Sequence, residues 1–187
     1  MVEGLLPCGP ARPVRRYPEL IHNQPYQRSA VEEATDVQRV AQAGWTAAYD
    51  DILRTETIER AMEEWYATES VSGQIKREDV GFFVAEDGSD VVGYVTGGPG
   101  ESEDTAVLGA VYVDPDRWEE GIGSRLLERF ESFCREEGYE AVSFEVFVGN
   151  EVGASFYRKH GYSADERRES DLFNEPVETY LFSGELD

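Results

Sequence analysis

The sequence contains very little cysteine and histidine, and this shortage excludes two classes of protein. Cys8 and Cys134 are the only cysteines in 187 residues, too few for a disulfide framework, and His22 and His160 stand alone. No group of these residues has the spacing of metal ligands, so we expect no metal site. All four are expected to be ordinary core or surface residues.

Long apolar runs are also missing. The longest ones fall well short of the roughly 20 residues that a membrane-spanning helix needs, and MVEGLLPCGPARP at the start has no apolar region after a basic one. We therefore expect a cytoplasmic protein without a membrane partner. Residues 1–25 are rich in proline and show little periodicity, which predicts an extended N-terminal arm. The remaining residues, 26–187, suffice for one domain.

Positive charge is scarce as well. The chain carries 39 acidic against 17 basic residues, a formal net charge of −22, and its only lysines are Lys76 and Lys159. Nucleic acid is not expected as a partner, because contacts with phosphates need a basic face. Two explanations of the excess of acidic residues stay open. They create a negative electrostatic field that attracts a cationic substrate, or they form the solvated surface of a halophilic protein. We favour the second, because acid is spread along the whole chain.

The first part of the chain reads as a strand followed by two helices. A first strand is expected within residues 26–36. Thr35 and Gln38 have the spacing of a capping box, and the apolar face that follows predicts a helix over 35–49. A second amphipathic helix is expected near residues 57–67.

The middle of the chain reads as strands around one long helix. The stretch GFFVAEDGSDVVGYVTGG, residues 81–98, has the pattern of a hairpin. Residues 105–113 form an apolar run typical of a strand buried on both faces, and Gly109 within it predicts a bulge or a close backbone approach. A helix over residues 122–138 and a strand over 141–148 follow, and such a strand, helix and strand make a right-handed parallel unit.

The end of the chain predicts a short helix over residues 150–159 and an antiparallel pair of strands near 164–172 and 177–184. The fold class is therefore α/β, with a mixed sheet around a central parallel pair. The last strand is rich in aromatic residues, and it could pair across a homodimer.

One short stretch, DPDRWEEGIGSRLLERF, carries the first functional indication. Gly121 and Gly123 precede an amphipathic helix, whose free amide N–H groups and positive dipole end stabilise an anion. The alternative is a tight turn that needs glycine only for its dihedral angles. Two other glycine motifs do not fit. A P-loop needs lysine and then Ser/Thr after its last glycine, whereas Gly123 is followed by Ser124 and Arg125. A dinucleotide fingerprint needs a third glycine where Leu126 stands.

Two blocks resemble the GCN5-related N-acetyltransferase (GNAT) superfamily, and the resemblance covers most of the chain from about Tyr26. VYVDPDRWEEGIGSRLLERFESFCREEG is similar to the family's acetyl-CoA loop and helix, and VSFEVFVGNEVGASFYRKHGY to its second signature. The second block is also similar to ribosomal-protein N-terminal acetyltransferases. The resemblance implies a mostly antiparallel mixed sheet with a splayed parallel pair, flanking helices, and acetyl-CoA as co-substrate without a metal.

The resemblance also implies which residues hold the coenzyme. In the family, the loop amides bind the pyrophosphate, so Glu119 and Glu120 can point their side chains to solvent while their amides face the phosphate. Trp118 stands where the family usually has Gln or Arg. This difference argues against a contribution of this side chain to pyrophosphate binding, but not against that of the backbone amides. The implied coenzyme-binding residues are Val111, Tyr112, Val113, Glu119, Glu120, Gly121, Ile122, Gly123, Ser124 and Asn150, the last of which is equally suited to cap its helix.

Two side chains are candidates for catalysis. Tyr157 lies seven residues after Asn150, where the family carries its general acid, and a neutral phenol suits the protonation of a thiolate; alone, it would read as a core tyrosine. Glu145 occupies the position of the base in ribosomal-protein acetyltransferases, acting through water or with a raised pKa; the alternative is a solvent-facing strand residue. The family's other position for a base is Val107 here.

Glu103 and Asp104 are weaker candidates for the base, and the oxyanion donor is expected to be a backbone N–H near Val113. The function indicated is direct acetyl transfer from acetyl-CoA to a primary amine, without a covalent enzyme intermediate. The alternative is a catalytically silent acyl-CoA-binding sensor or interaction module. The acceptor stays open among protein N-termini, lysine, polyamines and small-molecule amines.

Overall fold

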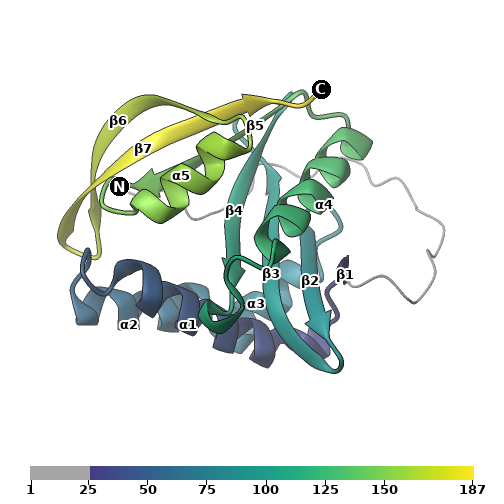
Figure 1. The fold of residues 1–187 in the computed structure, drawn as a ribbon, viewed down its shortest axis with the longest axis horizontal. Coiled ribbons are helices and arrows are strands. Elements are labelled where there is room, and N and C mark those ends of the chain that lie inside the picture. Colours follow the sequence, from purple (N-terminus) through teal and green to yellow (C-terminus); the bar gives the residue numbers. More distant parts are fainter. Residues whose placement is uncertain (1–25) are drawn as a thin grey trace.

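The computed structural model describes residues 26–187, and the expected N-terminal arm, 1–25, lies outside the described residues. One seven-stranded sheet forms the centre, with the strand order β1-β2-β3-β4-β5-β7-β6. Helices α1, α2 and α3 cover one face, while α4 and α5 lie on the other (Figure 1). The fold is mixed α/β, as the sequence predicts.

The helices are α1 (Ala34–Tyr49), α2 (Thr55–Trp65), α3 (Thr68–Ile75), α4 (Ile122–Glu137) and α5 (Glu151–Lys159). The strands are β1 (Tyr26–Arg28), β2 (Gly81–Asp87), β3 (Asp90–Pro99), β4 (Thr105–Val113), β5 (Ala141–Phe147), β6 (Ser163–Leu172) and β7 (Glu175–Glu185). The predicted hairpin of β2 and β3, the β4–α4–β5 unit and the final antiparallel pair are all confirmed.

Two apolar cores lie on opposite faces of the sheet, because side chains along a strand point alternately to its two sides. In β2, Phe82 and Val84 pack with α1 to α3, whereas Phe83 and Ala85 pack with α4. Cys134 is fully buried in the apolar face of α4, so it is a core residue as expected. The sheet is therefore held rigidly from both sides.

The central parallel pair is joined over a short distance only. β4 and β5 pair from Thr105 to Val107 on β4, and their pairing stops there. The predicted bulge at Gly109 is confirmed, since β3 pairs with Leu108 and then with Ala110 and leaves Gly109 as the extra residue. Beyond the bulge β4 and β5 separate, and a gap opens in the middle of the sheet (Figure 1).

Three local predictions are wrong or incomplete. The first strand ends at Arg28, because a 3₁₀ turn (Val31–Glu33) follows, and Glu33 binds the Ala30 N–H and the Ser29 hydroxyl. The capping box of Thr35 and Gln38 does not form, since α1 already begins at Ala34 and Gln38 accepts a bond from Thr68 instead. Helix α3 was not predicted.

The last strand is not at an edge of the sheet. β7 pairs with β5 on one side and with β6 on the other, so it has no free edge to offer a second copy of the chain. The expectation that this strand pairs across a dimer is therefore wrong, and β6 is the edge strand at that end. Among the described residues, no helix is long and apolar enough to cross a membrane.

Candidate active site

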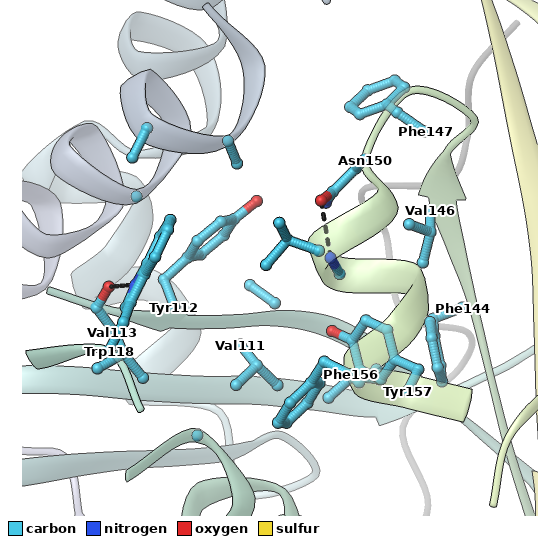
Figure 2. Close-up of a pocket in the computed structure, with 18 of the residues that line it drawn as sticks. Val111, Tyr112, Val113, Trp118, Phe144, Val146, Phe147, Asn150, Phe156 and Tyr157 are labelled. Carbon is cyan, nitrogen blue, oxygen red and sulfur yellow. Dashed lines mark hydrogen bonds between the residues drawn. The ribbon is translucent and has the colours of Figure 1, made fainter. Parts of the chain in front are cut away.

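A cavity of about 720 Å³ occupies the gap where β4 and β5 separate. Its walls come from α1, the second half of β4, the loop before α4, the end of β5 and helix α5 (Figure 2). The predicted coenzyme-binding residues and the two main catalytic candidates, with one exception, line this cavity: Val111, Tyr112, Val113, Glu119, Gly121, Ile122, Gly123, Ser124, Glu145, Asn150 and Tyr157.

The exception is Glu120, which is not among the residues that line the cavity. Its carboxylate accepts three hydrogen bonds of 2.8 to 3.0 Å from the guanidinium of Arg117, which also binds Asp87. These bonds hold the pKa of Glu120 below its usual value. One of the two acidic side chains beside the glycine loop is therefore neutralised by an ion pair with Arg117.

The loop before α4 presents a row of free backbone donors. Glu119 and Gly121 have φ angles of 68° and 76°, a left-handed conformation that turns successive amides toward one side. Arg125 is the first residue of α4 whose amide finds a helical acceptor, the carbonyl of Gly121. Within residues 26–187, the amides of Glu119 to Ser124 donate to no protein acceptor. This arrangement lies at the positive end of a 16-residue helix, and its electrostatics favour a negatively charged group.

Trp118 begins this loop and lies at the cavity wall. Its indole N–H donates to the carbonyl of Val113 at 3.0 Å (Figure 2), which fixes the ring at the end of β4. The ring is nonetheless 42% exposed. Trp118 thus connects β4 to the loop before α4, and it contributes an apolar surface to the cavity instead of a charged or amide side chain.

Tyr157 extends from α5 toward β4, with its hydroxyl directed into the cavity (Figure 2). Its ring packs against Phe144 at a centroid distance of 4.2 Å and against Phe156 at 5.1 Å. Burial raises the pKa of Tyr157 above its ordinary value, so the phenol keeps its proton. The residue therefore combines a buried ring with a functional end that reaches the cavity.

Glu145 lies on β5 and is about one-fifth exposed. One carboxylate oxygen accepts a bond of 2.7 Å from the hydroxyl of Thr179, and the other lies 3.4 Å from the guanidinium of Arg168. The carboxylate is thus held at the cavity wall by two neighbouring strands. The weaker candidates Glu103 and Asp104 precede β4, at the far end of the strand from the cavity.

Asn150 caps α5, since its side-chain oxygen accepts a bond of 2.8 Å from the amide of Gly153 (Figure 2). It also lines the cavity beside Tyr49, whose hydroxyl lies 3.1 Å from that of Tyr112. Burial raises the pKa of Tyr49, and hydrogen bonds with Tyr112 and Asn150 partly oppose this rise. Tyr49, Tyr112 and Asn150 therefore contribute two hydroxyl groups and an amide to this part of the cavity wall.

Sequence reasoning missed three residues of this site. His160 lines the cavity and binds Ser124, although the sequence indicated an ordinary residue. Its position three residues after Tyr157, on the same helix face, was the available signal. Thr179 and Arg168 reach Glu145 only because β7 and β6 add to the sheet beside β5. No local pattern could have placed them there.

One cavity thus brings together the free amides at the start of α4, the phenol of Tyr157 and the carboxylate of Glu145. Comparison with known proteins agrees with this arrangement. Residues 42–162 match the model of the Acetyltransferase (GNAT) family. A spermidine N(1)-acetyltransferase of Thermoplasma acidophilum is 27% identical over 156 residues, which cover 80% of this chain and 94% of that protein.

Two solved structures have the same fold. The PaiA N-acetyltransferase from T. acidophilum, in complex with coenzyme A, has a TM-score of 0.76 and 24% identity, over 86% of this chain and 97% of that one. The ribosomal-protein-S18-alanine N-acetyltransferase from Escherichia coli has a TM-score of 0.65 and 14% identity, over 87% and 93%.

Proposed function

This chain belongs to the acetyltransferase (GNAT) family, and from that premise we propose that it moves the acetyl group of acetyl-CoA directly to a primary amine. The observation that carries the proposal is that the free amides of Glu119 to Ser124 and the hydroxyl of Tyr157 open into one cavity. An anion site and a proton donor on opposite walls suit a long ligand that has a phosphate end and a reactive end.

The residues present fit acetyl-CoA, whose thioester supplies the acetyl group. The free amides at the start of α4 would hold its diphosphate, since they have no other acceptor within residues 26–187. Gly123 faces Phe156, and a Cβ atom at this position would lie 3.5 Å from the ring, in ordinary contact. The separated ends of β4 and β5, including Val111 and Val113, would line the coenzyme's slender arm.

Tyr157 would act as the general acid that protonates the departing sulfur. This role needs a group that is neutral at the working pH and lies inside the cavity. The raised pKa of Tyr157, caused by burial, meets the first condition, and its position on α5 meets the second.

Glu145 would act as the base, taking the proton of the attacking amine through a water molecule. Thr179 and Arg168 hold its carboxylate in place. A carboxylate is in general a weak base toward an ammonium ion, because the reference pKa of a carboxylic acid is several units lower. Transfer through water, after the amine has entered the cavity, fits such a group better than direct abstraction from a bound ammonium.

The acceptor would enter between α1 and the end of β5. Ala47 and Ala48 contribute small side chains to the cavity wall there, and Trp45 and Phe147 contribute aromatic ones. A relative named spermidine N(1)-acetyltransferase and a net charge of −22 favour a cationic small-molecule amine over an internal lysine of a folded protein. Polyamines are therefore the first acceptors to test, with protein N-terminal peptides as the comparison.

The test is an acetylation assay that detects the free thiol of released coenzyme A, run with a panel of amines. Release of coenzyme A that depends on the added amine supports the enzyme. Tight binding of acetyl-CoA with no amine-dependent release for any acceptor would instead indicate the silent binding module.

A further inference from the structure

His160 joins the end of α5 to the first turn of α4. It is the C-terminal capping residue of α5, and its Nδ1 atom lies 2.8 Å from the carbonyl oxygen of Phe156. Its Nε2 atom lies 2.9 Å from the hydroxyl of Ser124. Ser124 belongs to the row of free amides that forms the anion site, and both residues line the cavity.

These two contacts fix which ring nitrogen carries hydrogen. A carbonyl oxygen can only accept, so Nδ1 must donate to Phe156. In the neutral imidazole Nε2 is then an acceptor, and the Ser124 hydroxyl must donate to it. In the imidazolium, Nε2 donates instead, and the hydroxyl hydrogen of Ser124 is released to bond elsewhere.

We propose that His160 is a positioning residue for the phosphate end of the coenzyme, because it decides whether the Ser124 hydroxyl can donate to an anion at the α4 amides. The proposal rests on the proposed binding of acetyl-CoA at this site. With neutral His160 the hydroxyl hydrogen is held by the ring. With protonated His160 it is free to donate, and the imidazolium adds a positive charge beside the anion site.

The expected consequence is that coenzyme A binds more tightly as the pH falls from 8.0 to 5.5. Histidine is the side chain that ordinarily changes charge in this range. The charged groups that line the same cavity are Glu119 and Arg117 from the loop before α4, Glu145 from β5, and Glu151 and Lys159 from α5. Arg125 of α4 also lies near, and its guanidinium donates to the carbonyl of Glu120.

The experiment is calorimetric titration with coenzyme A from pH 5.5 to 8.0, for the wild type, His160→Gln, Ser124→Ala and the double variant. Phosphate monoesters titrate near pH 6, and this contribution is the same for every variant. We expect the wild-type affinity to rise about tenfold more on acidification than that of His160→Gln. The effects of the two single substitutions at pH 5.5 should not add in the double variant, because both remove one hydrogen bond.

Arg158→Gln is the matched control, since it removes a positive charge from the same helix turn at an exposed ion pair with Glu151. It should keep the wild-type pH dependence. An equal pH dependence in the wild type and His160→Gln overturns the proposal, and so does a wild-type pH dependence in Ser124→Ala, which leaves the fold of α5 untouched. A wild type that binds no coenzyme A at any pH would overturn the proposed function instead.

Discussion

The hydroxyl of Tyr157 is the only group of its side chain that the proposed reaction uses. Removing it therefore tests the catalytic step separately from the binding of acetyl-CoA. Tyr157→Phe keeps the ring packed against Phe144. We expect turnover to fall by about 10²- to 10⁴-fold, as for a lost general acid, while the affinity for acetyl-CoA stays the same. Steady-state kinetics with calorimetry check both values, and wild-type turnover in the variant would contradict the assignment.

The raised pKa of Tyr157 gives a second test at the same residue. Its neutral form is favoured in the fold, so the stabilisation is present below the unfolded value of about 10 and is lost only as the pH rises above it. The acid should therefore work throughout the range from pH 6 to 10. A loss of turnover centred near pH 8 to 9 in the wild type, absent from the residual activity of Tyr157→Phe, would show that the phenol ionises early.

The proposed role of Glu145 as the base can be tested by comparison with Glu166, which forms an ion pair with the same arginine. Arg168 binds both Glu145 and Glu166, but Glu166 is exposed and does not line the cavity. Glu145→Gln should lower kcat/KM for the amine by about 10²-fold, whereas Glu166→Gln should change it less than about twofold. Equal effects of the two substitutions would indicate that the ion pair, and not the base, matters.

At the residue scale, most of the proposed site residues that line the cavity could be predicted from the sequence. The contacts that orient their side chains could not. Tyr157 and Glu145 could be placed because both lie in one local block. Glu120 was assigned with its neighbours, although it does not line the cavity and its side chain forms an ion pair with Arg117. His160, Thr179 and Arg168 act through partners on other elements, which periodicity does not reveal.

At the scale of elements, Gly97 on β3, which pairs with Leu108 beside the β4 bulge, has no space for a side chain. A Cβ atom on Gly97 would lie 2.4 Å from the carbonyl oxygen of Val107 and 2.5 Å from the ring of Phe130. Gly97→Ala should therefore lower the free energy of unfolding by about 1–3 kcal/mol and disturb the point where β4 leaves β5. Chemical denaturation measures the change.

Gly73 in α3 provides the matched control, because a Cβ atom there meets nothing within 4 Å. Gly73→Ala should stabilise the protein by about 0.5–1 kcal/mol through its helix propensity. Opposite effects of Gly97→Ala and Gly73→Ala on the free energy of unfolding would show that the lack of space for a side chain is specific to the sheet. Destabilisation of similar size at both glycines would contradict it.

The elements were predicted best where apolar periodicity and turn residues agreed, as in the β2–β3 hairpin and in α4, which ends before Gly138. The start of α1 was misplaced because Glu33 binds the Ala30 amide one turn before the expected capping box. Helix α3 was not predicted because its eight residues include a glycine and give only two buried positions, Val71 and Ile75.

At the scale of the whole molecule, the net charge of −22 opposes the binding of an anionic coenzyme. Raising KCl from 0.1 to 1 M shortens the Debye length from about 10 to about 3 Å. We expect the affinity for coenzyme A to increase with KCl, as the halophilic interpretation requires. Pantetheine lacks the phosphates and serves as the control that should not respond. Unchanged or weaker binding of coenzyme A in molar KCl would contradict the expectation.

The overall topology could be predicted only in part. The parallel contact of β4 and β5 follows from the handedness of a strand, helix and strand with short connections. The insertion of β7 between β5 and β6 does not follow from any local pattern, since it depends on the long-range pairing of Phe144 with Phe182. That insertion brings Thr179 to Glu145 and therefore completes the far wall of the cavity.

The central claim is that the backbone amides at the start of α4 bind the diphosphate of the coenzyme. A crystal structure of the protein with coenzyme A tests it most directly. The account predicts diphosphate oxygens within about 2.7–3.2 Å of amide nitrogens between Glu119 and Ser124. A coenzyme bound with its diphosphate away from these amides would contradict it.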